Sequence, residues 1–197
     1  MRARGKIIAL EGIDMAGKTA TVRNAVTELR RAGYAVQAAD ELNSDIGRVI
    51  RGFLRGDATT TTETLALLFS AARLDALHRA EALLCEGVSL VFDRFLWSSL
   101  VYQGARGEDT WVQQVNTRTP HADLNIVLDL DPRIAAARND ARPDIWDGDL
   151  EFQERVRDGY LRLVQQHPTT ARLIDASRDP AMVLADVVRE IQQVLDE

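Results

Sequence analysis

An eight-residue stretch near the start of the chain has the composition of a loop that binds phosphate. It reads GIDMAGKT, which matches the pattern GxxxxGK[ST]. Glycines near its ends allow backbone N–H groups to turn toward phosphate oxygens. The ammonium group of the lysine can reach β- and γ-phosphates, and the threonine hydroxyl can hold Mg²⁺. The members of this phosphate loop are Gly12, Ile13, Asp14, Met15, Ala16, Gly17, Lys18 and Thr19.

Two charged residues, Asp93 and Arg94, follow the apolar run VSLVF at 88–92. A carboxylate at the end of a strand can orient Mg²⁺ or its water ligands, and a guanidinium can grip a phosphate with its planar fork. A surface ion pair between the two neighbours is the alternative explanation. Beside a phosphate loop, the pair favours a site that handles a second phosphate.

A third pair, Phe69 and Arg73, lies in the stretch LLFSAAR. Residues four apart share one face of a helix, where a ring can stack on a base and a guanidinium can bond to the base edge. Spacing alone favours a simpler arrangement, in which Phe69 belongs to the core and Arg73 extends toward solvent.

The elements that must position these residues alternate between short apolar runs and longer amphipathic stretches. Strands are predicted at 6–11, 34–40, 88–93, 123–130 and 171–176, and helices at 18–32, 46–54, 61–87, 150–167 and 179–196. Threonine begins the third of these helices, and Gly33 and Gly87 end two of them. The pattern predicts an α/β domain, residues 1–197, with a parallel sheet covered by helices on both faces. The polar segment 138–149 is predicted to be a mobile loop between two helices.

The composition narrows the class of protein. The chain has 197 residues, enough for one compact domain, and a formal net charge of -6, which argues against general nucleic-acid binding. No apolar run is long enough for a membrane span or a signal peptide. The single cysteine, Cys85, cannot form an internal disulfide and is predicted to be a small core residue. We expect a cytoplasmic protein without nucleic-acid or membrane partners.

Several stretches together resemble the thymidylate kinase family over nearly the whole chain. They are IIALEGIDMAGKT, LLFSAAR, DRFLWSSLVYQG, ADLNIVLDLDP and LEFQERVRDGY, of which DRF..SS..YQG at 93–104 is the most specific. Members of the family transfer the γ-phosphoryl group of ATP to dTMP with Mg²⁺. The resemblance implies a P-loop kinase fold with five parallel strands and a short lid at about 138–149. It also implies ATP and dTMP, or a related pyrimidine nucleotide, as ligands, and a homodimer.

The resemblance further implies roles for individual residues, and it reverses the preference from spacing for Phe69 and Arg73. The phosphate loop and Arg138 would bind ATP, and Thr19 and Asp93 would hold the metal. In the acceptor site, Asp14 would meet the sugar 3′-hydroxyl or the water shell of the metal, and Arg94 the acceptor phosphate. The other implied acceptor contacts are Phe69 stacked on thymine, Arg73 at O4, Ser99 at the base edge and Tyr102 against C2′. The implied catalytic residues are Lys18, Arg94, Asp14 and Arg142.

The chain departs from the family pattern at several positions. Asp40 and Leu42 stand where the family often has arginine and proline, so that Arg48 or Arg51 would have to supply the missing charge. Met15 brings no charge to the tip of the phosphate loop, where some members have arginine. We expect the charge to come from the lid, with Arg142 as the first candidate and Arg138 and Arg155 as the others.

Two alternative functions remain open on the sequence. Trp97, which replaces a common aspartate, is expected to add bulk near the acceptor pocket. Together with the changes at 40–43, it leaves open a kinase of the same fold that acts on another pyrimidine nucleotide or on a nucleoside. The second alternative is a regulatory protein that binds nucleotide and has a weakened lid.

Overall fold

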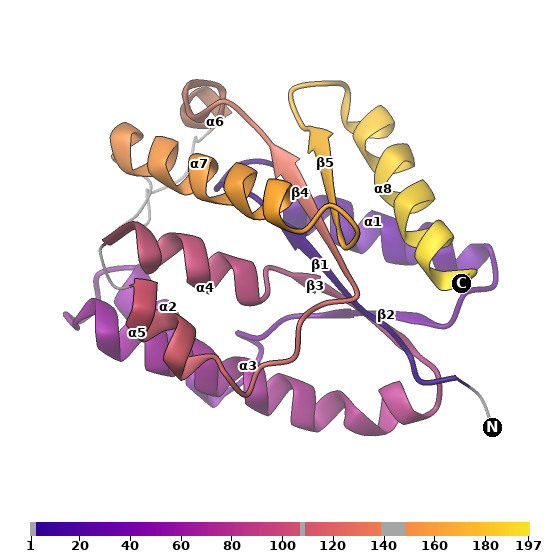
Figure 1. Ribbon diagram of the computed structural model, residues 1–197, viewed down its shortest axis with the longest axis horizontal. Coiled ribbons are helices and arrows are strands. Elements are labelled where there is room, and N and C mark those ends of the chain that lie inside the picture. Colours follow the sequence, from indigo (N-terminus) through magenta and orange to yellow (C-terminus); the bar gives the residue numbers. More distant parts are fainter. Residues whose placement is uncertain (1–2, 107–108, 139–148) are drawn as a thin grey trace.

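A sheet of five parallel strands forms the centre of the computed structural model, which describes residues 3–106, 109–138 and 149–197 (Figure 1). The strand order is β2-β3-β1-β4-β5. Strands β1, β3 and β4 are buried along nearly their whole length, as expected for apolar strands that are covered on both faces. The five predicted strands are thereby confirmed, each slightly shorter than the pattern indicated. Their bounds are Ile7–Glu11 for β1, Val36–Ala39 for β2, Ser89–Asp93 for β3, Leu124–Asp129 for β4 and Ala171–Asp175 for β5.

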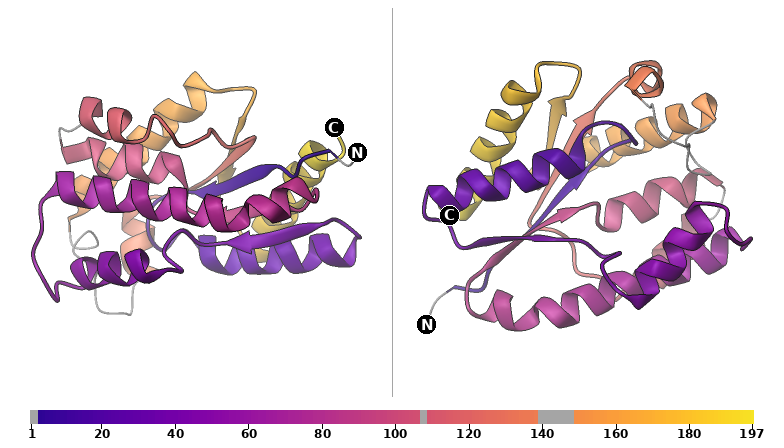
Figure 2. Two further views of the ribbon diagram at one scale, coloured as in Figure 1. Left: turned by 90° about the horizontal axis from the view of Figure 1, so that it is seen from below. Right: turned by 180° about the vertical axis from the view of Figure 1, so that it is seen from behind.

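Helices cover both faces of this sheet (Figures 1 and 2). One face is covered by α1 (Lys18–Arg31) and α8 (Pro180–Leu195), which also pack on each other. On the other face α3 (Thr62–Cys85) and α7 (Leu150–Gln166) contact the strands, and α4 (Leu96–Tyr102) lies between them. The other helices pack on this layer: α2 (Asp45–Leu54), α5 (Asp109–Val115), α6 (Pro132–Arg138) and the short 3-10 helix η1 (Gly104–Arg106). None of the helices in the described ranges is both long and apolar enough to cross a membrane.

The long helices begin and end where their capping residues predict. The hydroxyl of Thr61 accepts a hydrogen bond from the Thr64 N–H at the start of α3, and the Asp149 carboxylate accepts one from the Phe152 N–H at the start of α7. Gly33 and Gly87 follow α1 and α3 in the left-handed conformation. Helices α4 and α5 were not predicted, and the helix before residue 138, α6, was expected without bounds, because seven residues are too few for a clear helical period.

The parallel register brings three chain segments to one edge of the sheet. Leu10 pairs with Asp93, and Ala39 pairs with Phe92, so that the segments after β1, β2 and β3 emerge side by side. Gly12 allows the chain to turn there: its φ is 137°, and a Cβ atom would lie 2.5 Å from the Leu128 carbonyl oxygen. Ligands of open parallel sheets bind at this carboxyl edge.

The prediction that Cys85 belongs to the core is wrong. Its side chain is exposed at the end of α3, with the sulfur 3.5 Å from Arg4 Nη1 and 3.4 Å from Glu81 Oε1. Leu84 is the residue that is buried in this turn. Consecutive helical positions point about 100° apart, so the side chain after Leu84 faces away from the core.

Candidate active site

The phosphate loop joins β1 to α1, in the context that its motif requires. Gly17, with φ of 90°, is the N-cap of α1, and Met15 also has a left-handed backbone, with φ of 60°. Left-handed residues of this kind occur in turns whose N–H groups converge on an anion. Met15 is 38 % exposed and is not among the residues of the core or those packed against it. The backbone of the loop and the N-terminus of α1 therefore form the phosphate-binding element.

Lys18, the first residue of α1, has its ammonium group inside the loop. Its Nζ donates a hydrogen bond to the Ile13 carbonyl oxygen at 2.6 Å, and the side chain is only 6 % exposed. The pKa of Lys18 is lowered from 10.5 to about 8, mainly by burial and also by the charge of nearby Arg94, whereas Asp14 and Asp93 act in the opposite direction. An approaching phosphate would favour the charged form of this ammonium.

Thr19 and Asp93 meet at the mouth of the phosphate loop. The hydroxyl of Thr19 donates to Asp93 Oδ2 at 2.5 Å. One hydroxyl and one carboxylate fit Mg²⁺, which takes oxygen ligands and is usually bound through one or two protein groups together with substrate phosphates. These two residues, which the sequence predicts as metal ligands, are thus placed together.

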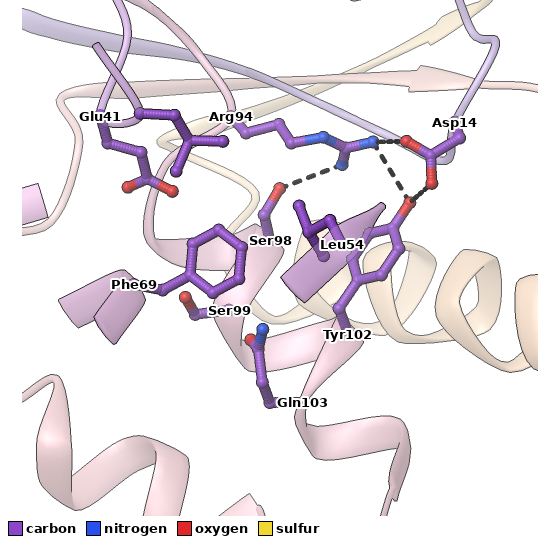
Figure 3. Close-up of a pocket in the computed structure, with 10 residues that line it drawn as sticks. Asp14, Glu41, Leu54, Phe69, Arg94, Ser98, Ser99, Tyr102 and Gln103 are labelled. Atoms are coloured by element: carbon purple, nitrogen blue, oxygen red, sulfur yellow. Dashed lines mark hydrogen bonds and ion pairs between the residues drawn. The ribbon is translucent and has the colours of Figure 1, made fainter. Parts of the chain in front are cut away.

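A cavity of about 120 Å³ lies beside the phosphate loop (Figure 3). The aromatic ring of Phe69 stands toward one side of it and Asp14 and Tyr102 toward the other. Side chains from five separate segments of the chain meet here, so the cavity exists only in the folded protein. Its lining residues are Asp14, Glu41, Leu42, Leu54, Phe69, Arg94, Ser98, Ser99, Tyr102 and Gln103.

Arg94 and Asp14 form an ion pair at one end of the cavity. Arg94 has an unusual backbone, with φ of 67°, and its guanidinium also donates to the Gly12 carbonyl oxygen at 2.9 Å. The Tyr102 hydroxyl donates to Asp14 Oδ2 at 2.9 Å. Burial acts to raise the pKa of Asp14, but the positive charges of Arg94 and Lys18 outweigh it and hold the pKa below its usual value. Asp14 is therefore ionised, and this end of the cavity has a fixed carboxylate and a fixed guanidinium.

Arg73 lies one layer behind the cavity. The side chain is fully buried and is absent from the cavity lining, so it neither extends to solvent nor touches the cavity directly. It donates from Nη2 to Ser99 Oγ at 2.7 Å and from Nη1 to Asn116 Oδ1 at 2.6 Å, and its Nε lies 2.8 Å from Glu41 Oε2. Burial raises the pKa of Glu41 to about 7, although the charge of Arg73 acts against this. Ser99 and Glu41 are the neighbours of Arg73 that do reach the cavity.

Several residues of the site were missed by sequence reasoning. Glu41 and Leu54 line the cavity from two separate segments, and nothing in their spacing indicates this. Ser98 and Gln103 also line it and belong to the motif at 93–104, but no role was predicted for either. A better signal existed for Glu11, a charged residue within the apolar strand IIALE that is fully buried. Charged residues are almost never fully buried without partners, so a charged residue in an apolar strand indicates a buried network of hydrogen bonds.

The expectation that Trp97 adds bulk to the acceptor pocket is wrong. Trp97 is 3 % exposed and packs on the ring of His167, with centroids 5.6 Å apart, in the core between α4 and the end of α7. Ser98, Ser99 and Tyr102 occupy the face of α4 that lines the cavity. The tryptophan lies on another face of this one short helix and is absent from the lining.

The arginines that were candidates for the missing charges have defined places where the structure describes them. Arg51 donates to the Leu42 carbonyl oxygen at 2.6 Å, and Arg138 donates to the Ala176 carbonyl oxygen at 3.3 Å. Arg155 pairs with Glu151 at 2.9 Å, and Arg48 pairs with Asp45. Arg142 lies outside the described residues.

Comparison with known proteins identifies relatives that match this chain over almost its full length. The family model for thymidylate kinase matches residues 10–187. A probable thymidylate kinase of Pyrococcus horikoshii is 33% identical, with 98% of each chain covered. A thymidylate kinase of Jannaschia sp. is 36% identical over 96% of this chain and 97% of the relative. A probable thymidylate kinase of Methanosphaera stadtmanae is 35% identical over 95% and 98%. The chain belongs to the thymidylate kinase family.

Proposed function

We propose that this protein transfers the γ-phosphoryl group of ATP to dTMP and thereby forms dTDP. The observation that carries the proposal is the cavity between Phe69 and the Arg94–Asp14 pair, which opens beside the phosphate loop. An aromatic wall suits a pyrimidine base, and a guanidinium at the other end suits a phosphate. The acceptor would then point its phosphate toward the loop that holds the donor.

The chemistry requires positioning and neutralisation of charge rather than a general base. The phosphate oxygens of dTMP are already ionised and nucleophilic, so no proton has to be removed. The barrier comes from bringing two polyanions into line. Lys18 and the N-terminus of α1 would offset negative charge on the donor, and Arg94 would hold the acceptor phosphate.

Thr19 and Asp93 are the residues that would hold Mg²⁺. The ion would neutralise charge on the donor phosphates when bound. Asp14 would bond the 3′-hydroxyl of the acceptor sugar or the water shell of the metal. Arg138 would bind ATP from the end of α6.

A lid at about 138–149 would complete the site, and Arg142 would supply the positive charge that Met15 cannot. Replacement of Arg142 by alanine is expected to lower kcat about 10²-fold or more, as for other arginines that stabilise a transferring phosphoryl group. Met15→Arg in the same chain should restore part of this loss, because it returns a cation to the tip of the phosphate loop. A single variant Arg142→Ala with the wild-type rate would contradict this role.

An acceptor panel tests the proposed substrate. Initial rates would be measured with MgATP and dTMP, dUMP, dCMP or thymidine, and dTMP is expected to have the highest kcat/KM. Tyr102, if it lies against C2′, should make the ribonucleotide TMP a poor acceptor, and Tyr102→Ala should narrow that difference. A different nucleotide or a nucleoside as the best acceptor would overturn the proposal. Nucleotide binding without transfer to any of them would instead indicate a regulatory protein.

We further propose that the chain, residues 1–197, acts as a single domain in the cytoplasm and as a homodimer that packs through α3. Leu67 of this helix is 49% exposed, and its side chain would be covered if α3 packed against α3 of a second copy. Sedimentation at micromolar concentration would test the homodimer. The variant Leu67→Glu is expected to shift the mass toward one chain.

A further inference from the structure

Glu11 is a buried carboxylate to which the proposed mechanism gives no task. It is the last residue of β1, directly before the phosphate loop, and it is fully buried. Its Oε1 accepts from the backbone N–H groups of Phe95 at 3.0 Å and Ser98 at 3.3 Å. Its Oε2 accepts from the Ser98 hydroxyl at 2.6 Å and the Tyr160 hydroxyl at 3.1 Å. A carboxylate with these four donors is satisfied without a direct contact to a cation.

The two backbone contacts fix the start of α4. Phe95 is the N-cap of this helix and provides no side-chain cap, so Glu11 accepts from the Ser98 N–H, which a capping side chain would otherwise bond, and also from the N–H of Phe95 itself. The negative charge also suits a helix N-terminus. Arg94 lies directly before this point in a left-handed conformation, which a residue other than glycine holds only where its surroundings enforce it. The Arg94 N–H is itself held by the Leu10 carbonyl oxygen at 3.0 Å, next to Glu11.

The hydroxyl groups of Ser98 and Tyr160 each contact both Glu11 and the guanidinium of Arg94. Figure 3 shows the contact between Ser98 and Arg94. Arg94 Nη1 lies 3.3 Å from Ser98 Oγ and 3.5 Å from the Tyr160 oxygen, and the two oxygens are 2.9 Å apart. Each hydroxyl has one proton, which goes to Glu11 directly or through the other hydroxyl. Lone pairs of these oxygens are therefore left for the Nη1 group of Arg94. Nη2 is left to face Asp14 and Tyr102 at the cavity.

We propose that Glu11, Ser98 and Tyr160 are positioning residues that orient Arg94 toward the acceptor phosphate. Glu11 would fix the backbone that carries Arg94, and the two hydroxyls, together with the Gly12 carbonyl oxygen at 2.9 Å from Nη1, would fix its guanidinium. Tyr160 comes from α7, so this helix contributes to acceptor binding without touching the acceptor. The inference rests on the proposed role of Arg94 in binding the phosphate of dTMP.

A double-mutant cycle between Tyr160→Phe and Arg94→Ala tests this inference. The phenylalanine keeps the buried ring and removes only the hydroxyl. We expect Tyr160→Phe to lower kcat/KM for dTMP about tenfold at saturating MgATP, with KM for ATP within twofold of wild type. In the Arg94→Ala background the same change should cost less than twofold, because the group that Tyr160 positions is gone. Ser98→Ala is expected to give the same pattern.

The outcomes separate the inference from the proposal beneath it. An equal loss from Tyr160→Phe in both backgrounds, or no loss in the wild type, would show that the hydroxyl does not act through Arg94. Wild-type kcat/KM in Arg94→Ala would remove the proposed role of Arg94 and the inference with it. Tyr34→Phe is the matched control. The Tyr34 hydroxyl also donates to a carboxylate, Asp196 at 2.9 Å, and neither of these residues lines the cavity. Its kcat/KM should equal that of the wild type.

Discussion

The donor and acceptor sides of the site are built in different ways. The phosphate-binding part of the donor side is one contiguous loop, Gly12–Thr19, whose binding groups are the backbone, the N-terminus of α1 and one lysine. The acceptor side is a cavity to which five separate segments contribute side chains. Behind it lies a buried ion pair, Arg73 with Glu41, that touches Ser99 and Asn116. The donor side is therefore encoded locally, whereas the acceptor side depends on the packing of the whole domain.

The two sides should therefore also differ in how their buried charges affect catalysis and the stability of the fold. A buried charge that meets a ligand, such as Lys18, is unfavourable for the fold and useful for the reaction. A buried charge that meets another charge, such as Arg73, is required by its partner. Substitutions on the two sides should consequently affect different measurements.

The largest effect is expected from Lys18→Ala. Loss of the ammonium removes the cation that faces the donor phosphates, and kcat should fall about 10³-fold or more. The free energy of unfolding should stay equal or rise, because a lysine whose pKa burial lowers to about 8 is held in a costly environment. Steady-state rates and urea unfolding of the same preparation would check both. If Lys18→Ala kept near wild-type turnover, or unfolded at a lower urea concentration than the wild type, the proposed difference between the two sides would be contradicted.

In contrast to Lys18→Ala, Arg73→Met is expected to destabilise the fold. This change leaves the Glu41 carboxylate buried without its cation, which should lower the free energy of unfolding by about 3–5 kcal/mol. The double variant Arg73→Met with Glu41→Leu should recover most of that loss, because it removes the second charge as well. Urea unfolding of the wild type and the two variants would measure it. Equal stability of the single and double variants would show that the pair is not coupled.

The same contrast explains what could be predicted from the sequence. The order of strands and long helices follows from apolar runs, periodicity and caps such as Thr61 and Gly33, which are local signals. The phosphate loop is equally local. Helix α4, although it carries Ser99 and Tyr102, could not be predicted, because it has only seven residues and its start is fixed by Glu11 from strand β1.

The acceptor residues illustrate the limit of spacing as a guide. Phe69 and Arg73 were placed on one helix face, and spacing favoured a core phenylalanine with an exposed arginine. The ring lines the cavity, and the guanidinium is fully buried, because Glu41 and Asn116 arrive from other elements and satisfy it. Neither partner could be identified from α3 alone. Cys85 and Trp97 were misjudged for the same reason, since the face that a residue presents depends on what packs there.

A substitution of Phe69 should affect the acceptor side alone. Stacking of a base on an aromatic ring contributes about 1–3 kcal/mol, so Phe69→Ala should raise KM for dTMP by roughly 5- to 150-fold. KM for ATP should not change, because Phe69 lines only the acceptor cavity. Phe69→Tyr retains a ring and is the matched control, with KM within a few-fold of wild type. An equal rise in both KM values would indicate a general disturbance of the fold.

The smallest predicted effect is a dependence of MgATP binding on pH that belongs to the donor side. The pKa of Lys18 in the free protein is about 8, and a bound triphosphate raises it because the phosphates favour the ammonium form. Binding therefore takes up a proton when the pH exceeds 8, and the affinity falls as the pH rises. The Kd for MgATP should be constant near pH 7 and about tenfold higher at pH 9.

Calorimetric titration at a series of pH values would measure this dependence, and Lys18→Ala provides the control. Without the ammonium, the weaker Kd of the variant should stay flat between pH 7 and pH 9. The Kd for dTMP of the wild type should also stay constant between pH 7 and pH 9. Arg94, which is proposed to hold the phosphate of dTMP, has a guanidinium that keeps its charge over this range. A slope for MgATP that survives in Lys18→Ala would assign the proton to another group. If the Kd for dTMP changed with pH as strongly as the Kd for MgATP, the two sides of the site would not differ in the way proposed. The donor side would no longer be distinguished by a cation that titrates between pH 7 and pH 9.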